Sequence, residues 1–316
     1  MKTSLSVTTL NEESTIDWLL TAISEQFVLP DEIIIVDGGS TDKTVKKIKR
    51  WQQNHELGQI IRLFPKKGNR SIGRNFAVSK ARHEWIAFTD AGCLPYQDWL
   101  QVLLRTQRET SADVVAGYYQ GLPQTRFEEA VVPYVLVMPH RVNQKNFLAA
   151  SRSMLIRKSM FRKLGGFDKT LNHNEDFAFA NKLKQAKVPM AFAADALVGW
   201  LPRQNLRDFW QMIHRFAFGD IQAKIVRPKV VLIFTRYLIF LGLLTWMIII
   251  GELRQTGSFF PLLISLYLLW AVMKNKRYVP HGWLWLPVLQ VTSDLAVMLG
   301  SLTGAYFLIK RTKSST

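Results

Sequence analysis

The first two-thirds of the chain alternates short apolar runs with amphipathic stretches, and this alternation limits the fold more than any other feature. Apolar runs that are rich in β-branched residues and bounded by polar or turn residues predict strands at Leu5–Thr8, Glu32–Val36, Ile60–Phe64 and Trp85–Thr89. Helical spacing and capping residues between them predict helices at Asn11–Glu25, Ser40–Trp51, Ile72–Ala81 and Asp98–Thr110. Because strand–helix alternation forms βαβ units, we expect an α/β domain with a mostly parallel sheet covered on both faces.

The alternation becomes less regular after Gly117. Two further strands are expected at Phe147–Ile156 and Met190–Leu197, with a helix at Asp176–Ala186 between them. We expect the α/β domain to occupy residues 1–204 and an amphipathic helical connector to occupy 205–229.

Residues 230–316 differ in character, because they hold three apolar runs. The run Val230–Gly251 is apolar apart from Arg236, Phe259–Met273 is shorter, and Leu284–Ile309 is interrupted by Pro287, Asp294, Gly300 and Gly304. About 20 apolar residues are needed to cross a bilayer, so we predict a membrane region of two or three helical segments. The alternative is a buried helical subdomain of a soluble protein. The length of the first run and the aromatic and basic residues that flank the second favour the membrane.

The charge of the chain limits its partners. With 41 Lys and Arg against 24 Asp and Glu among 316 residues, the formal net charge is +17. Nucleic acid, an anionic membrane surface and a phosphorylated small molecule are the partners to consider. The sequence shows no stacking-rich RNA motif and no zinc finger, so the other two are favoured and nucleic acid is not expected. Cys93 is the only cysteine, which excludes an intrachain disulfide.

Two acidic residues follow apolar strands. Asp37 ends the run Ile33–Val36 and precedes Gly38-Gly39-Ser40, and Asp90 follows Trp85–Thr89. Each alone is equally well explained as a residue that ends a strand. Together they would lie at one edge of the sheet, where open α/β sheets bind ligands. A hard cation that bridges a diphosphate takes oxygen ligands, and Asp90 is the natural candidate.

Two other segments carry candidate chemistry. In Ser71–Ala77, Gly73 permits close approach of a ligand and Arg74 offers a planar donor fork for phosphate; an ordinary solvated basic loop is the alternative. Glu175 and Asp176 stand together before a predicted helix. They either serve the helix dipole or provide a general base.

The order of these segments resembles the family 2 glycosyltransferases, which have the GT-A nucleotide-diphospho-sugar transferase fold. The resemblance spans about the first 220 residues and rests on Val7–Glu13, Asp37-Gly38-Gly39-Ser40-Thr41-Asp42, Gly73-Arg74-Asn75, Asp90-Ala91-Gly92, Gly165-Gly166-Phe167-Asp168 and Glu175-Asp176. It implies that the nucleoside is held by Thr8, Asn11, Glu12 and Asp37. It also implies that Arg74 and Asn75 lie near the ribose and diphosphate, that Asp90 serves the donor and a metal, and that Asp176 is the catalytic base.

One departure from the family pattern concerns the metal. Gly92 stands where the second acid of the Asp-x-Asp motif is usual, and glycine has no side chain to ligate with. A divalent cation, Mg²⁺ or Mn²⁺, would therefore be held by Asp90, the diphosphate and water.

The function expected from the resemblance is that of a membrane-anchored, inverting glycosyltransferase of polysaccharide or glycolipid biosynthesis in the cell envelope. It would move a sugar from a nucleotide-diphosphate sugar to a hydroxyl of a lipid-linked or membrane-associated acceptor. Transfer to polyprenyl phosphate is the main alternative within this class. A non-catalytic, membrane-bound protein that binds nucleotides or nucleic acid is the alternative outside it. A NAD-dependent enzyme is disfavoured, because the first strand–helix junction lacks Gly-x-Gly-x-x-Gly.

The distribution of basic residues predicts a multi-pass cell-membrane protein with a cytoplasmic catalytic domain. Arg227 and Lys229 place that domain inside, residues Glu252–Ser258 would lie outside, and Lys274, Lys276 and Arg277 would return to the inside. A third full span would put the basic tail outside. A broken or re-entrant third segment would keep it inside, and both arrangements remain open.

Overall fold

The computed structural model describes residues 1–144, 147–249 and 259–313. The chain divides into two compact units, of which the first comprises Met1–Leu122 and Leu136–Leu201. The second comprises Pro123–Val135 and Pro202–Thr316.

The first unit is built on one sheet that, within the described residues, has eight strands in the order β3-β2-β1-β4-β7-β6-β8-β5. The strands are β1 (Thr3–Thr9), β2 (Glu32–Asp37), β3 (Ile61–Pro65), β4 (Trp85–Phe88), β5 (Cys93–Pro95), β6 (Val114–Gly121), β7 (Met154–Arg157) and β8 (Met190–Trp200). Strands β3, β2, β1 and β4 are parallel neighbours, as are β6 and β8. Strand β7 runs antiparallel to both β4 and β6, and β5 runs antiparallel to β8. The sheet is therefore mixed.

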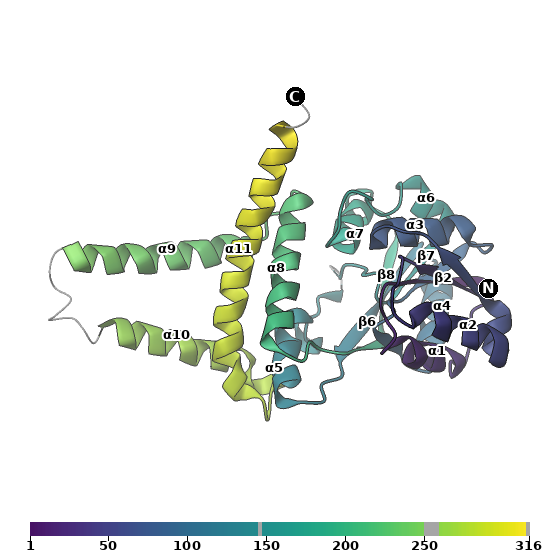
Figure 1. Ribbon diagram of the computed structural model, residues 1–316, viewed down its shortest axis with the longest axis horizontal. Coiled ribbons are helices and arrows are strands. Elements are labelled where there is room, and N and C mark those ends of the chain that lie inside the picture. Colours follow the sequence, from purple (N-terminus) through teal and green to yellow (C-terminus); the bar gives the residue numbers. More distant parts are fainter. Residues whose placement is uncertain (145–146, 250–258, 314–316) are drawn as a thin grey trace. The chain divides into compact units, whose positions relative to one another are not determined.

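Helices cover both faces of this sheet (Figure 1). They are α1 (Ile16–Ser24), α2 (Thr44–Asn54), α3 (Arg70–Lys80), α4 (Trp99–Thr110), α6 (Lys158–Lys163) and α7 (Glu175–Gln185). Helices α3, α6 and α7 lie on one face, where Phe88, Phe161, Phe167 and Phe179 join the buried core. Helices α1, α2 and α4 lie on the other. Alternate residues of β2 face opposite sides, and the whole strand is buried, as expected for a strand with helices on both faces.

The α/β prediction is confirmed, with one wrong strand. Residues 147–153 do not belong to β7, which begins at Met154. Phe147 and Ala149 are apolar because they pack against the core, and the chain turns at an isolated bridge between Ala150 and Ser153. The Ser153 hydroxyl accepts a hydrogen bond from the Trp99 indole at 2.8 Å. Apolar composition alone did not distinguish core packing from strand pairing.

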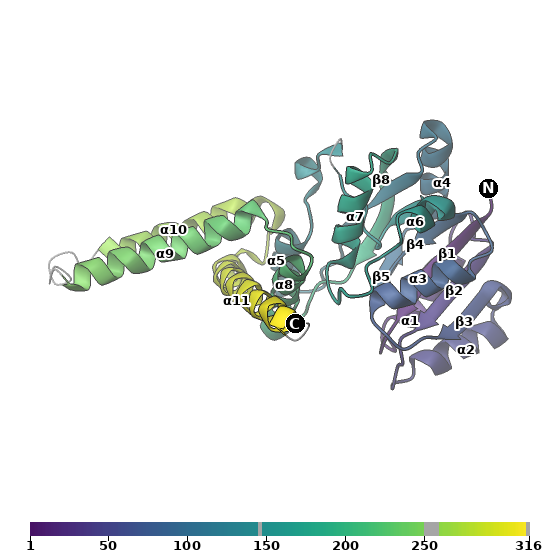
Figure 2. The same ribbon diagram turned by 90° about the horizontal axis from the view of Figure 1, so that it is seen from above.

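The second unit is helical. Its helices are α5 (Arg126–Val135), α8 (Leu206–Gln222), α9 (Pro228–Ile249), α10 (Phe259–Asn275) and α11 (Leu286–Lys313). Helices α9 and α10 extend alongside each other, with the rings of Phe240 and Phe260 5.5 Å apart, whereas α11 runs across their direction and packs along α8 (Figures 1 and 2). The sequence prediction for residues 252–258 lies outside the described residues.

The structure explains the residues that interrupt the third apolar run, because α11 is one continuous helix. Pro287 lies in its first turn, where proline costs no hydrogen bond. A Cβ atom at Gly300 would lie 2.4 Å from the His214 carbonyl oxygen, and one at Gly304 would lie 3.0 Å from that of Phe218. The two glycines therefore let α11 approach α8 closely, as small residues do in membrane helix packing.

Asp294 of α11 lies in a polar cluster enclosed by apolar helices. Its side chain is 1% exposed and forms an ion pair with Arg236 of α9 and a hydrogen bond with the Tyr267 hydroxyl of α10. The Gln290 amide donates a further hydrogen bond to Asp294 at 3.0 Å. This carboxylate thus connects three helices, and removal of Arg236 would leave the buried Asp294 without its counter-charge.

We therefore expect Arg236→Ala to lower the stability of the purified protein by ~3–5 kcal/mol, because the buried Asp294 carboxylate would lose its counter-charge. The fall is measurable as a lower Tm in detergent. The double variant Arg236→Met/Asp294→Leu should regain most of the loss, since it removes both charges. A double variant as unstable as the single one would contradict this account.

Candidate active site

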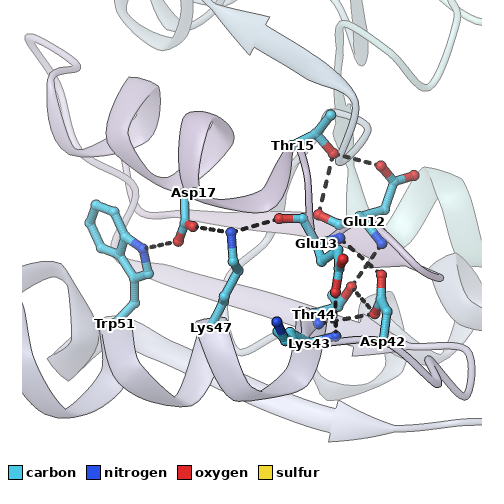
Figure 3. A network of polar contacts seen from close by, with 9 residues as sticks. All are labelled: Glu12, Glu13, Thr15, Asp17, Asp42, Lys43, Thr44, Lys47 and Trp51. Carbon is cyan, nitrogen blue, oxygen red and sulfur yellow. Dashed lines mark hydrogen bonds and ion pairs between the residues drawn. The ribbon is translucent and has the colours of Figure 1, made fainter.

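The loops that follow β1 and β2 are joined by hydrogen bonds (Figure 3). The Glu12 amide donates to the Thr44 hydroxyl at 2.7 Å, and the Glu13 amide donates to Asp42 at 3.1 Å. Asn11, whose φ is 55°, accepts a hydrogen bond from the Thr41 amide at 2.8 Å. The Glu12 carboxylate accepts from the Thr15 hydroxyl at 2.6 Å and so closes the start of α1. The two loops form one connected wall at the carboxyl edge of the sheet.

Asp37 shapes the turn that follows β2. Its carboxylate accepts hydrogen bonds from the amides of Gly39 and Ser40, both at 3.0 Å, and from the Ser40 hydroxyl at 2.5 Å. The Thr9 hydroxyl donates a longer one at 3.4 Å from the paired position on β1. Asp37 therefore organises the loop, and its predicted contact with the nucleoside stays a prediction.

Arg74 links the parts of the site that are distant in sequence. Its guanidinium donates to Asp90 at 2.6 Å and to Glu175 at 2.5 Å, and its side chain is only 3% exposed. It also lies over the Phe167 ring, 5.5 Å from the centroid. Each carboxylate receives one charge-assisted hydrogen bond, and such bonds are stronger than those between neutral groups. Arg74 thus fixes the position of Asp90 relative to the start of α7.

Neighbours of Arg74 on α3 hold other parts of the site. The Asn75 side chain donates to the Phe167 carbonyl at 2.7 Å and accepts from the Phe167 amide at 2.9 Å. A Cβ at Gly166, whose φ is 66°, would lie 2.6 Å from the Asn75 oxygen. A Cβ at Gly73 would lie 2.9 Å from the Thr8 methyl group. These contacts position the site, and the predicted donor contacts of Thr8, Asn11, Glu12, Arg74 and Asn75 stay predictions.

Asp176 has the environment of a general base. It lies in the first turn of α7, and its carboxylate accepts a hydrogen bond from the Phe177 amide at 2.8 Å. Burial raises the pKa of Asp176, and the neighbouring Glu175 carboxylate raises it further, whereas Arg74 opposes both effects. A carboxyl whose pKa is raised accepts a proton more readily.

Asp90 has the opposite character. Burial would raise its pKa, but the guanidinium groups of Arg74 and Arg70 outweigh burial and hold the pKa of Asp90 below its ordinary value. Asp90 therefore stays ionised, whereas the raised pKa of Asp176 makes its carboxylate easier to protonate. Two acids whose pKa values are pushed apart are typical of acid–base assignments in active sites.

The protein supplies few ligands for a divalent cation. Oδ1 of Asp90 is bonded to Arg74, which leaves Oδ2 as its available oxygen. Nowhere in the described part of the chain do three His, Cys, Asp or Glu residues gather as a metal site would require. These residues fit a cation only as part of a ligand set that is completed by diphosphate oxygens and water.

Two features of the site were not predicted from sequence. Glu175 was expected to serve the helix dipole or the base, and its ion pair with Arg74 was not predicted. Arg152 precedes β7 and carries no motif, yet its positive charge acts on both Asp90 and Asp176. Its only sequence signal was its place just before an apolar strand.

Comparison with known proteins identifies the family. Residues 4–165, about half of the chain, match the family described as "Glycosyl transferase family 2". The chain belongs to glycosyl transferase family 2. This membership makes it a glycosyltransferase, so the non-catalytic and NAD-dependent alternatives are set aside.

Several relatives of this glycosyltransferase have curated names. Glycosyltransferase AglE of Haloferax volcanii is 22% identical, with 70% of this chain and 73% of AglE covered. The O-antigen chain rhamnosyltransferase RfbN of Salmonella typhimurium is 25% identical, with 66% of this chain and 71% of RfbN covered. The succinoglycan biosynthesis protein ExoA of Rhizobium meliloti is 26% identical, with 68% of this chain and 67% of ExoA covered.

Solved structures share the fold. The mannosyltransferase PcManGT from Pyrobaculum calidifontis, in complex with GDP-Man and Mn²⁺, has a TM-score of 0.54 at 20% identity. The match covers 70% of this chain and 62% of PcManGT. Residues 1–349 of S. aureus TarS, in complex with UDP-GlcNAc, have a TM-score of 0.51 at 21% identity, over 69% of this chain and 66% of TarS. These matches confirm the GT-A fold of the glycosyltransferase.

The Arg74 link predicts a stability effect. We expect Arg74→Ala to cost ~3–5 kcal/mol, because Glu175 and Asp90 would be left without their shared counter-charge. Arg70→Ala, which removes an exposed arginine from the start of the same helix, should change little. Thermal unfolding of the purified full-length variants measures both effects. Equal Tm values for the two variants would show that the link does not stabilise the fold.

Proposed function

We propose that this glycosyltransferase is membrane-anchored and inverting, and that it transfers a sugar from a nucleotide-diphosphate sugar to a hydroxyl of a lipid-linked or membrane-associated acceptor. The observation that supports this most directly is the pairing of acids around Arg74. One acid, Asp90, is held ionised, and another, Asp176, has a raised pKa at the start of α7.

The proposed reaction is a single displacement. The acceptor hydroxyl attacks the anomeric carbon from the face opposite the diphosphate, and its proton passes to a carboxylate oxygen of Asp176. The new glycosidic bond forms as the bond between the anomeric carbon and the diphosphate oxygen breaks. The electron pair of the broken bond leaves with the nucleoside diphosphate. One base is sufficient, and the configuration is inverted because a single displacement occurs.

The donor would lie along the wall formed by the loops after β1 and β2, with its diphosphate near Asp90. A divalent cation that enters with the donor would be held by Oδ2 of Asp90 and would neutralise charge on the diphosphate. The structure of PcManGT, whose name includes Mn²⁺, supports this use within the fold. Loss of activity in EDTA that Mn²⁺ or Mg²⁺ restores would test it.

Two considerations support the proposed acceptor. An acceptor phosphate is already anionic and has little need of a base, so the raised pKa of Asp176 favours a hydroxyl over polyprenyl phosphate. The names of RfbN and ExoA refer to O-antigen chain and succinoglycan, both of which are polysaccharides. We infer a related envelope glycan or its lipid-linked precursor for this chain.

The membrane anchor is proposed from α9 and its neighbours. Among the described residues, two segments are long and apolar enough to cross a membrane, Pro228–Ile249 and Trp283–Lys310. Length and composition alone select these two segments. The second of them contains α11, which runs across α9 and α10 and packs along α8 (Figures 1 and 2). We therefore infer that α9 and α10 form the crossing hairpin. Helix α10 has 17 residues and spans ~26 Å, slightly less than a ~30 Å hydrocarbon core.

This arrangement satisfies the charge rule. Lys229, before the apolar part of α9, and Lys274, at the end of α10, would both lie on the cytoplasmic side. Because α11 would not cross the bilayer, its basic end would stay on that side as well.

We expect Asp176→Asn to lower sugar transfer by ~10²–10⁴-fold, because the amide keeps the shape and loses the ability to accept the proton. Membranes that contain the enzyme would be incubated with a panel of radiolabelled nucleotide sugars, and label in the lipid and glycan fractions would be counted. Binding of UDP, GDP or dTDP, measured by calorimetry, should be unchanged. Near-normal transfer with intact binding would rule out Asp176 as the base.

The pH dependence provides a second measurement of the same base. Asp176 must be deprotonated to act, so kcat/KM should fall as the pH drops through its raised pKa, on a limb centred above ~4, the ordinary value for aspartate. The charged groups that act on this carboxyl are Glu175, Arg74, Asp90 and Arg152. An acid limb below the ordinary aspartate value would contradict the assignment.

Cysteine labelling tests the topology. In a Cys93→Ser background, Lys49→Cys on the catalytic unit and Lys310→Cys on α11 should resist an impermeant thiol reagent in intact cells, and both should react after permeabilisation. Lys49 and Lys310 are both exposed, so access is limited only by the membrane. Labelling of Lys49→Cys in intact cells would overturn the cytoplasmic assignment. Labelling of Lys310→Cys alone would show that α11 crosses.

A further inference from the structure

Arg152 is the second guanidinium of the site, and within the part of the chain that the structure describes it has no anionic partner of its own. Its Nε atom is enclosed, and among the described residues it has neither a hydrogen-bond acceptor nor an ion-pair partner. The guanidinium lies 4.8 Å from the Tyr119 ring centroid and 5.6 Å from that of Trp200. An enclosed polar group without a partner is costly, so such groups are rare unless a ligand completes them.

The position of Arg152 places it on the ligand-binding edge. It lies just before β7, separated from Met154 by Ser153. Because β7 runs antiparallel to β4, Arg152 lies at the same edge as Asp90, which follows β4. Tyr119 and Trp200 lie near the carboxyl ends of β6 and β8 at this edge. The charge of Arg152 opposes the effect of burial on the carboxyls of both Asp90 and Asp176. Arg152 is therefore within electrostatic reach of the atoms at which transfer would occur.

Arg74 is not available to bind a phosphate group. Both terminal nitrogens of its guanidinium donate hydrogen bonds to carboxylates, one to Asp90 and one to Glu175. A phosphate group that enters the site needs donors that are not already used, and a planar guanidinium fork matches phosphate oxygens.

We propose that Arg152 binds a phosphate oxyanion of a substrate at the carboxyl edge of the sheet, with Tyr119 and Trp200 holding its guanidinium in place. This inference rests on the proposed function. The phosphate has two sources in that reaction, the diphosphate of the donor and a phosphate of a lipid-linked acceptor. In both cases the group lies beside Asp90 and Asp176 and uses donors of Arg152 that no described residue occupies.

The test uses calorimetry on purified full-length protein, with wild type compared to Arg152→Gln and Arg152→Lys. The donor arm compares UDP, GDP and dTDP with the matching nucleoside monophosphates. The acceptor arm compares farnesyl phosphate with farnesol at saturating nucleoside diphosphate. We expect Arg152→Gln to weaken one phosphate ligand by about 10- to 100-fold, with little effect on its control ligand. Arg152→Lys should restore part of the affinity, because it keeps the charge and loses the fork.

The matched control is Arg157→Gln, at the far end of the same strand. Arg157 also lies over an aromatic ring, that of Trp85 at 4.9 Å, but it is paired with Asp113 at 2.6 Å. Loss confined to the diphosphates assigns Arg152 to the donor, and loss confined to farnesyl phosphate assigns it to the acceptor. Equal affinities in wild type and Arg152→Gln, or equal losses in Arg157→Gln, would overturn the proposal. If Arg152→Gln binds both the diphosphates and farnesyl phosphate as the wild type does, the glycosyltransferase mechanism stands while this inference fails.

Discussion

The bonds from Arg74 to Asp90 and Glu175 connect three segments that lie far apart in the sequence. Arg74 comes from α3, Asp90 follows β4, and Glu175 opens α7. Buried charges are stable only when they are paired and hydrogen-bonded, so none of the three can change position independently. The same helix α3 positions the Phe167 turn through Asn75. The location of Asp176, which follows Glu175, relative to Asp90 therefore depends on one buried arginine.

Much of the first half of the fold follows from local sequence. The four parallel strands were predicted within a few residues, because each is a short β-branched run between capped helices, and the acids at their ends mark the ligand edge. The second half was less readable. Strand β6 was not predicted, and β7 was placed too early because Phe147 and Ala149 pack in the core without joining a strand. Strand β7 pairs antiparallel with β4 and β6, which lie far from it in the sequence. Short sequence patterns do not predict such long-range pairing.

The same limit applies to the site and to the helical unit. The order of the motifs pointed to Asp90 and Asp176 as candidates. The ion pair of Glu175 with Arg74, by contrast, joins residues that are 101 positions apart, and Arg152 carries no motif. In the helical unit, Gly300 and Gly304 were noted as interruptions of the third apolar run, and a plain span and a broken passage both stayed open. The structure instead uses them for close contact with α8, because a Cβ atom at either position would press on the α8 backbone. A glycine in a helical sequence is compatible with a bend and with the close approach of another helix. Only the structure of the neighbouring helix shows which of the two occurs.

The balance of charge at the site explains why a second guanidinium is needed. Asp90, Glu175 and Asp176 are opposed by Arg74 and Arg152, so the formal charges of the cluster sum to a negative value before any substrate binds, and this value would be more negative without Arg152. Burial and Glu175 already raise the pKa of Asp176, and a diphosphate beside Asp90 would raise it further by adding negative charge. A base that is too easily protonated is unavailable to the acceptor. Positive charge must therefore accompany the donor or already be present, and Arg152 is placed to provide it where Arg74, held by two carboxylates, is not.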